Sequence, residues 1–161
     1  MEIKWKELGV EDEHIIKQYY GMEPIRNCEF TFANNLLWAP FYRISYAIVE
    51  DMLVFLSLDN EMSVSCPLGK ESLKKSVDVL MEYFKEKGKV FRMHLVSPKQ
   101  FEELEELYPG RFQIEYDRDS ADYVYESERL ISLAGKKLHG KRNHINRFKE
   151  NFPDWSYEKI T

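Results

Sequence analysis

Residues 135 to 148, GKKLHGKRNHINRF, concentrate cationic and imidazole side chains that could bind an anion. The sequence from Arg129 to Lys149 contains no Asp or Glu and seven basic residues, namely Arg129, Lys136, Lys137, Lys141, Arg142, Arg147 and Lys149. The whole chain has 23 basic and 28 acidic residues, so the remainder has 16 basic against 28 acidic residues, a net charge of −12. This separation indicates an anionic partner for the basic segment, or an acidic surface of the same protein packed against it.

We expect the basic segment to form a helix that ends before Pro153. At about 100° per residue, Leu138, Ile145 and Phe148 share one face with the aliphatic part of Lys141. The opposite face carries Lys136, Lys137, His139, Asn143, His144 and Arg147. One face can therefore pack on a sheet while the other meets an anion. The alternative is that the charged run is simply a solvated face.

The stretch GKKLHGK also matches part of the phosphate-binding pattern GxxxxGK followed by Ser or Thr. Gly135, Gly140 and Lys141 fit, but Arg142 stands where the hydroxyl should be. The preceding ERLISLA has helical spacing, whereas such a loop follows a buried strand. A nucleotide triphosphatase is therefore not predicted.

No metal site is predicted from the cysteines or the acidic residues. Cys28 and Cys66 lie in no Cys/His spacing typical of zinc, and we expect both to be buried, reduced thiols. Asp117, Asp119 and Asp122 lack the spacing and the closing Glu of a calcium loop, so a solvated turn is expected there.

Helical and strand patterns alternate along the chain. We expect helices at 11–20, 71–87 and 97–108, and a short helix within 27–38 between the breaks at Pro24 and Pro40. Strands are expected at 42–49 and 52–58, which would form a hairpin, and at 62–66, 90–96, twice within 112–125, and 155–160. The aromatic residues Phe30, Phe32, Trp38 and Phe41 are expected in the core. The order predicts an α+β or α/β fold, with helices on a mainly antiparallel sheet.

The run DYVYESERLISLAGKKLHGKRNHINRFKENFP resembles the signature of the phosphatidylglycerol lysyltransferase C-terminal domain-like family. CEFTFANNLLWAPFYRISYAIVEDMLVF and the later CPLG are similar to the N-terminal half of the same family. The resemblance implies a tandem pair of GNAT-like (acyl-CoA N-acyltransferase) domains, of which this chain would be the first. It divides the chain into a GNAT-like domain at 1–134 and, at 135–161, the basic helix and a strand leading toward the second unit.

The same resemblance implies transfer of an aminoacyl group from aminoacyl-tRNA, or of an acyl group from acyl-CoA, to an amine or hydroxyl acceptor such as a lipid headgroup. Phosphates of the donor or lipid would be bound by Lys136, Lys137, His139, Lys141, Arg142 and Arg147. His144 and Asn143 would orient or deprotonate the acceptor. None of the seven glycines fits the usual acetyl-CoA pyrophosphate loop. The alternative function is non-catalytic: binding of tRNA or an anionic membrane surface, or docking of a partner domain.

No stretch approaches the roughly 20 consecutive apolar residues of a membrane span, and the first residues, MEIKWKELGVEDEH, lack the apolar core of a secretory signal. We therefore expect a cytoplasmic protein. A lipid-headgroup acceptor would add peripheral association with a membrane.

Overall fold

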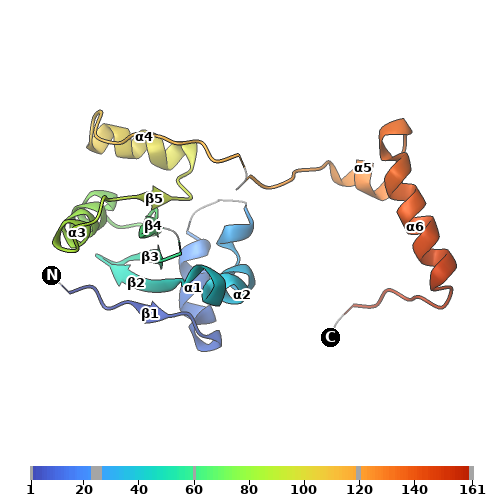
Figure 1. The fold of residues 1–161 in the computed structure, drawn as a ribbon, viewed down its shortest axis with the longest axis horizontal. Helices are drawn as coiled ribbons and strands as arrows, with labels where there is room; N and C mark the ends of the chain where they lie inside the picture. Colours follow the sequence, from blue (N-terminus) through green and yellow to red (C-terminus); the bar gives the residue numbers. More distant parts are fainter. Residues whose placement is uncertain (1, 23–26, 60, 119–120, 160–161) are drawn as a thin grey trace. The chain divides into compact units, whose positions relative to one another are not determined.

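The computed structural model describes residues 2–22, 27–59, 61–118 and 121–159 (Figure 1). Contacts within the chain divide it into two units, Met1–Asp117 and Arg118–Thr161. Each unit is described by itself below.

The first unit is built around a sheet. Its strands, within the described residues, are β1 (Lys6–Glu7), β2 (Ser45–Val49), β3 (Met52–Ser57), β4 (Ser63–Ser65) and β5 (Met93–His94), in spatial order β1-β2-β3-β4-β5 (Figure 1). The first three pairings are antiparallel, and only β4 and β5 pair in parallel. A parallel pair needs a crossover connection, which here contains α3 (Leu73–Glu86). The expected mainly antiparallel α+β fold is confirmed.

The predicted β2–β3 hairpin is present, although its turn has no glycine. Glu50 and Asp51 both adopt left-handed backbone angles, with φ of 49° and 60°. Such a turn matches the right-handed twist of the flanking strands. It places Val49 opposite Met52 and Tyr46 opposite Phe55.

Both faces of β3 are covered by helices, because its side chains alternate between two sets of partners. Val54 and Leu56 pack with Leu80 and Phe84 of α3. Leu53 and Phe55 pack on the other face in a cluster that includes Ile16 of α1 (Glu13–Tyr20) and Phe32 of α2 (Phe32–Tyr42). Met52 joins a third cluster with Leu104 of α4 (Pro98–Leu107). The sheet is therefore buried on both sides.

Short 3-10 turns precede α1 and α2, at η1 (Val10–Asp12) and η2 (Cys28–Phe30). Asp12 of η1 is only 2% exposed. It accepts hydrogen bonds from Lys6 Nζ at 2.5 Å, the Gly9 amide at 3.0 Å and the Tyr46 hydroxyl at 2.8 Å. Burial of Asp12 works to raise its pKa, but these donors outweigh burial and hold the pKa below its usual value. The carboxylate thereby joins β1, η1 and β2.

Most of the helices expected in the first unit are confirmed, and their ends have physical causes. Ser97 accepts a hydrogen bond from the Gln100 amide and Gln100 Oε1 accepts one from the Ser97 amide, so the two form a capping box for α4. The break expected at Pro40 is wrong, because α2 continues to Tyr42. Pro40 lies in the last turn of α2, so its missing amide removes one hydrogen bond near the end of the helix and leaves the preceding turns intact. The other expected break, Pro24, lies outside the described residues.

Other expectations for this unit are wrong. Trp38 and Phe41 are exposed, not part of the core. Cys66 is buried as expected, whereas Cys28 is exposed. Residues 112–118 and 121–125 contain no strand. A strand needs a neighbouring strand to satisfy its backbone groups, and none of the described strands pairs with this stretch.

The second unit contains α5 (Ser127–Ser132), the 3-10 turn η3 (Lys136–Leu138) and α6 (His139–Asn151). The predicted basic helix is therefore confirmed, and it ends before Pro153. The strand expected at 155–160 is wrong for residues 155–159, which have no regular structure.

Candidate anion-binding site

The basic helix α6 is held to α5 by one of its own cations. α5 ends at Leu133 in a left-handed conformation with φ of 48°, and Gly135 follows with φ of 90°. The Arg142 guanidinium of α6 donates hydrogen bonds to the Leu133 carbonyl and, at 3.0 Å, to the Gly135 carbonyl. Arg142 is half-buried. The Leu133 carbonyl lies at the end of α5, where carbonyls lack an intrahelical partner, and the Gly135 carbonyl also accepts a hydrogen bond from the Leu138 amide. Arg142 therefore acts in the structure as a clamp on this turn.

A hollow of about 420 Å³ lies next to this turn, within the second unit. Val124, Tyr125 and Glu126 line it from the extended segment before α5, Arg129 and Leu130 from α5, and Lys137 and Leu138 from η3. Val124, Leu130 and Leu138 give it an apolar wall. Arg129 and Lys137 bring positive charge to it, and Glu126 brings the one carboxylate among its described lining residues.

A third cation stands beside the hollow. The ammonium of Lys141 lies 5.5 Å from the centre of the Tyr125 ring, within the distance of a cation–π interaction. Lys141 therefore contacts a residue that lines the hollow, although Lys141 itself is not part of the lining. The hollow combines an apolar wall with the positive charges of Arg129 and Lys137, a combination expected to bind an anionic group attached to an apolar body.

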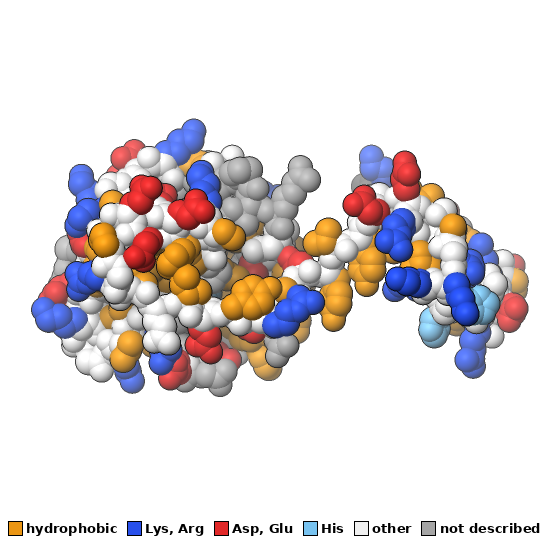
Figure 2. Space-filling model, turned by 90° about the horizontal axis from the view of Figure 1, so that it is seen from above, with side chains coloured by type: hydrophobic (Ala, Val, Ile, Leu, Met, Phe, Trp, Pro, Cys, Tyr) orange, Lys and Arg blue, Asp and Glu red, His pale blue; other side chains and the backbone are white. Residues whose placement is uncertain are grey.

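The remaining predicted anion ligands are exposed on η3 and α6. Lys136, His139 and Arg147 all face solvent. In the part of the chain that the structure describes, no Asp or Glu forms an ion pair with the basic side chains of 136–149. Figure 2 shows lysine, arginine and histidine side chains gathered on the surface of this unit. Their charge is therefore available to a ligand or to a partner.

The two catalytic candidates have different surroundings. The Asn143 side-chain amide lies 3.3 Å from His139 Nε2, one helical turn earlier. The His144 ring is exposed and has no hydrogen bond to any described residue. The structure gives neither residue a carboxylate partner among the described residues. Leu138 is half-buried, but Ile145 and Phe148 remain exposed, so no sheet covers the apolar face of α6 in the described part of this unit.

Three polar residues that line the hollow were not among the predicted ligands: Tyr125, Glu126 and Arg129. They precede the glycine-bounded basic run by six or more positions and lack a recognisable spacing to it. Arg129 contributed to the charge asymmetry of the sequence, which was the one signal pointing to it.

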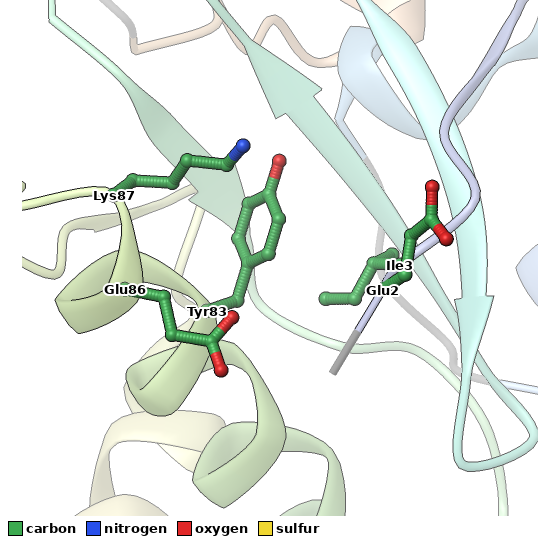
Figure 3. A pocket seen from close by; sticks show the side chains of 5 residues that line it. All are labelled: Glu2, Ile3, Tyr83, Glu86 and Lys87. Atoms are coloured by element: carbon green, nitrogen blue, oxygen red, sulfur yellow. The ribbon is translucent and has the colours of Figure 1, made fainter.

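The first unit offers a second hollow, of about 350 Å³, lined by Glu2, Ile3, Tyr83, Glu86 and Lys87. Figure 3 shows the Glu2 and Glu86 carboxylates on opposite sides of it, with the Tyr83 ring between them. The Lys87 ammonium lies 5.5 Å from the centre of that ring. The lining of this hollow mixes two carboxylates with one ammonium and does not define a ligand.

His94 of β5 has the surroundings of a structural residue. Its Nδ1 lies 2.9 Å from Ser63 Oγ, and burial lowers the pKa of the ring to about 4. The described residues contain no group of three or more His, Cys, Asp or Glu side chains arranged to hold a metal ion. None of the helices within those same residues has the length and apolar composition of a membrane span.

Comparison with known proteins places the chain in a family. The family described as "Phosphatidylglycerol lysyltransferase, C-terminal" matches residues 23–161. A crystal structure of a conserved protein of unknown function from Bacteroides thetaiotaomicron VPI-5482 is similar over 99% of this chain, with a TM-score of 0.84 and 34% sequence identity. This chain spans about half of that protein, 54% of its length. No curated protein matches.

The α+β sheet with helices on both faces fits the GNAT-like sandwich implied by the resemblance. The match covers most of the chain, including the basic helix and the hollow beside it. The chain therefore belongs to the phosphatidylglycerol lysyltransferase C-terminal family.

Proposed function

We propose that this chain is one acyltransferase-like part of a tandem GNAT-like protein. It would help to transfer an aminoacyl group from aminoacyl-tRNA, or an acyl group from acyl-CoA, to an amine or hydroxyl acceptor such as a lipid headgroup. The observation that carries this proposal is the hollow of the second unit. Arg129 and Lys137 line it together with apolar side chains, and Lys141 contacts the ring of Tyr125, which also lines it. All the named donors and lipid acceptors join phosphate groups to a less polar body.

The chemistry requires little covalent participation by the protein. The acceptor nitrogen or oxygen attacks the carbonyl carbon of the activated ester or thioester, and the bond from that carbon to the donor's oxygen or sulfur breaks. The acceptor gives up one proton, and the departing group takes one up. Positioning the acceptor against the activated ester supplies much of the rate. In this proposal the cations hold the phosphates, while His144 accepts the proton and Asn143 orients the acceptor.

The role proposed for Arg142 changes once its contacts are considered. Its guanidinium is already bonded to two backbone carbonyls. Arg142 therefore supports the phosphate site indirectly, by holding the turn between α5 and η3. Arg129 replaces it as a residue that contacts phosphate directly.

Binding of bulk tRNA, charged and uncharged, tests the phosphate site across a series of salt concentrations. We expect binding that weakens steeply as salt rises, because phosphate contacts release counterions. A variant with Arg129→Glu and Lys137→Glu should bind at least about tenfold more weakly at low salt. The matched control is Lys159→Glu, which reverses an exposed charge of the same unit outside the hollow. Equal affinity of the double variant and the control would refute the assignment of the hollow.

A second candidate function, docking of a partner domain, is favoured by the apolar surface of the second unit. Ile131 is 84% exposed, and Phe148, Phe152 and Trp155 are also exposed. Leu133 is the one large apolar side chain of the described part of this unit that is classed as buried. A unit with so little buried surface gains little stability from its own packing. We propose that the second GNAT-like unit covers it, and that partner docking is its role if no transfer activity exists.

A further inference from the structure

The apolar ridge of α2, formed by Leu37, Trp38, Phe41 and Tyr42, has no partner in the first unit. Leu37 is 77% exposed and Phe41 is 66% exposed, and the other two side chains are also exposed. The four residues recur at helical spacing of three and four, so they share one face of the helix. The buried residues of the same helix are Phe32, Asn35 and Ala39.

The ridge is ordered by its own ring contacts. The Phe41 and Tyr42 ring centres are 4.9 Å apart and nearly perpendicular, and the Trp38 ring lies 5.9 Å from Phe41 and 5.8 Å from Tyr42. Aromatic pairs favour edge-to-face arrangements of this kind. The three rings contact one another and form one contiguous surface.

The charge around the ridge is unusual for this chain. One third of all residues are charged, yet the 20 residues from Phe30 to Val49 contain no acid and a single base, Arg43. Arg43 is exposed and directly follows α2. A helix that is apolar on both sides needs an apolar neighbour on its outer side. Arg43 at the helix end can pair with an anionic group at the edge of that neighbour.

We propose that the ridge of α2 inserts into the interface of a lipid bilayer. Trp and Tyr prefer that interface because their rings are apolar and their N–H or O–H groups can stay hydrated. The helix has 11 residues, or about 16 Å, which is too short to span a bilayer and suits a helix lying in its surface. This inference rests on α2 alone and holds whether or not the proposed transfer reaction takes place.

The size of the ridge argues for lipid over a second copy of the chain. The four large side chains of the ridge are each exposed by about half or more, so together they offer on the order of 400 Å² of surface to a partner. A stable protein interface buries about 800 Å² on each partner. A bilayer has no such threshold, because binding grows with each apolar group inserted and phosphate groups lie within reach of Arg43.

Flotation of the 161-residue chain with lipid vesicles tests the inference. We use vesicles of phosphatidylcholine alone and vesicles that also contain phosphatidylglycerol. The chain should float with both, since insertion is driven by apolar groups. Phe41→Asp and Leu37→Asp should each lower the bound fraction at least about tenfold on both vesicle types. Val90→Asp is the matched control, because Val90 is 73% exposed in the same unit and lies outside α2.

Tryptophan emission gives an independent measurement. A variant with Trp5→Phe and Trp155→Phe retains Trp38 as its one tryptophan, since the chain contains three. Its emission should move to shorter wavelength when vesicles are added, because the Trp38 ring leaves water. An unchanged spectrum would overturn the inference, and so would ridge variants that float as well as the Val90→Asp control.

Failure of this inference can be told apart from failure of the proposed function. The variant with Arg129→Glu and Lys137→Glu should lose tRNA binding and keep its flotation with phosphatidylcholine vesicles. Absence of wild-type flotation would overturn the bilayer inference and leave the anion site standing. If the chain instead forms a dimer that Phe41→Asp dissociates, without any vesicle binding, then a second copy occupies the ridge and the bilayer inference is wrong.

Discussion

Arg142 offers the sharpest test of the second unit, because sequence and structure assign it different roles. As a phosphate ligand, its loss would lower anion affinity and leave the fold intact. As the clamp on the Leu133 and Gly135 carbonyls, its loss would loosen the turn between α5 and η3. Hydrogen bonds from a charged donor contribute about 1.5–3 kcal/mol each when well protected. Because Arg142 is only half-buried, we expect Arg142→Ala to cost about 2 kcal/mol for the pair.

Amide hydrogen exchange measures this cost directly. A local free energy lowered by about 2 kcal/mol corresponds to roughly 30-fold faster exchange. We expect this acceleration at the amides of α5 and the first turns of α6. The amides of Val77 and Leu80 in α3 should keep their rates, since both residues belong to the core of the first unit. Arg147→Ala is the control, because it removes an exposed cation of the same helix that has no partner among the described residues.

The refuting result is equally specific. If Arg142→Ala leaves exchange unchanged throughout α5 and α6, and weakens tRNA binding as strongly as Lys137→Glu does, then Arg142 is a ligand and the clamp is wrong. A conservative change separates the two further. Both carbonyls accept from the same guanidinium nitrogen, Nη1. Arg142→Lys keeps the charge, but its side chain ends one bond short of the position of Nη1, so it should accelerate exchange almost as much as alanine does.

Three further predictions concern the first unit. Asp12→Asn should lower the free energy of unfolding by about 2–3 kcal/mol at neutral pH, whereas Glu13→Gln, at an exposed ion pair, should change it by less than about 0.5 kcal/mol. The pKa of Asp12 is lowered in the folded state, so the carboxylate stabilises the fold above the unfolded pKa near 3.8, and this stabilisation is lost as pH falls through the folded pKa. Denaturant unfolding at neutral pH and in acid should therefore show that the stability difference between wild type and Asp12→Asn vanishes in acid. Ser97→Ala should destabilise the protein by about 1 kcal/mol through loss of the α4 cap, while thermal unfolding of Lys99→Ala should match wild type. The His94 ring should titrate in NMR spectra near pH 4, so stability falls as pH drops from about 6.5 toward 4, and a midpoint near 6.5 would contradict its burial.

The residues of the proposed phosphate site show how far spacing along a helix can identify residues that lie together. Lys137 and Lys141 were predicted as anion ligands; Lys137 lines the hollow, and Lys141 contacts the ring of Tyr125, which also lines it. Arg129, Tyr125 and Glu126 reach the same place because the chain reverses direction at Leu133 and Gly135. No periodic pattern describes such a reversal. Residues that come together from both sides of such a turn can therefore be identified only in the folded structure.

The sequence by itself determined the elements whose pattern is local. The β2–β3 hairpin, helices α3 and α4 and the basic helix α6 were all predicted from periodicity and end signals. In α3 and α4 the apolar spacing and a capping serine agree with each other, whereas α6 has no side-chain cap and was predicted from its spacing and the stop before Pro153. The family resemblance was also contained in the residue types alone, and the match over 23–161 confirms it.

Only the tertiary structure decided which apolar faces are covered and which polar groups are already engaged. Trp38 and Phe41 have the composition of core residues, yet they are exposed, because the inner side of α2 already fills the space above β3. The strand-like stretch 112–125 remains irregular in its described residues, because a strand forms only where another strand offers its backbone groups. Arg142 is bound to carbonyls nine and seven residues away, a contact set by chain reversal. Burial and hydrogen bonding depend on the neighbour that each group meets, and the neighbours are fixed by the fold as a whole.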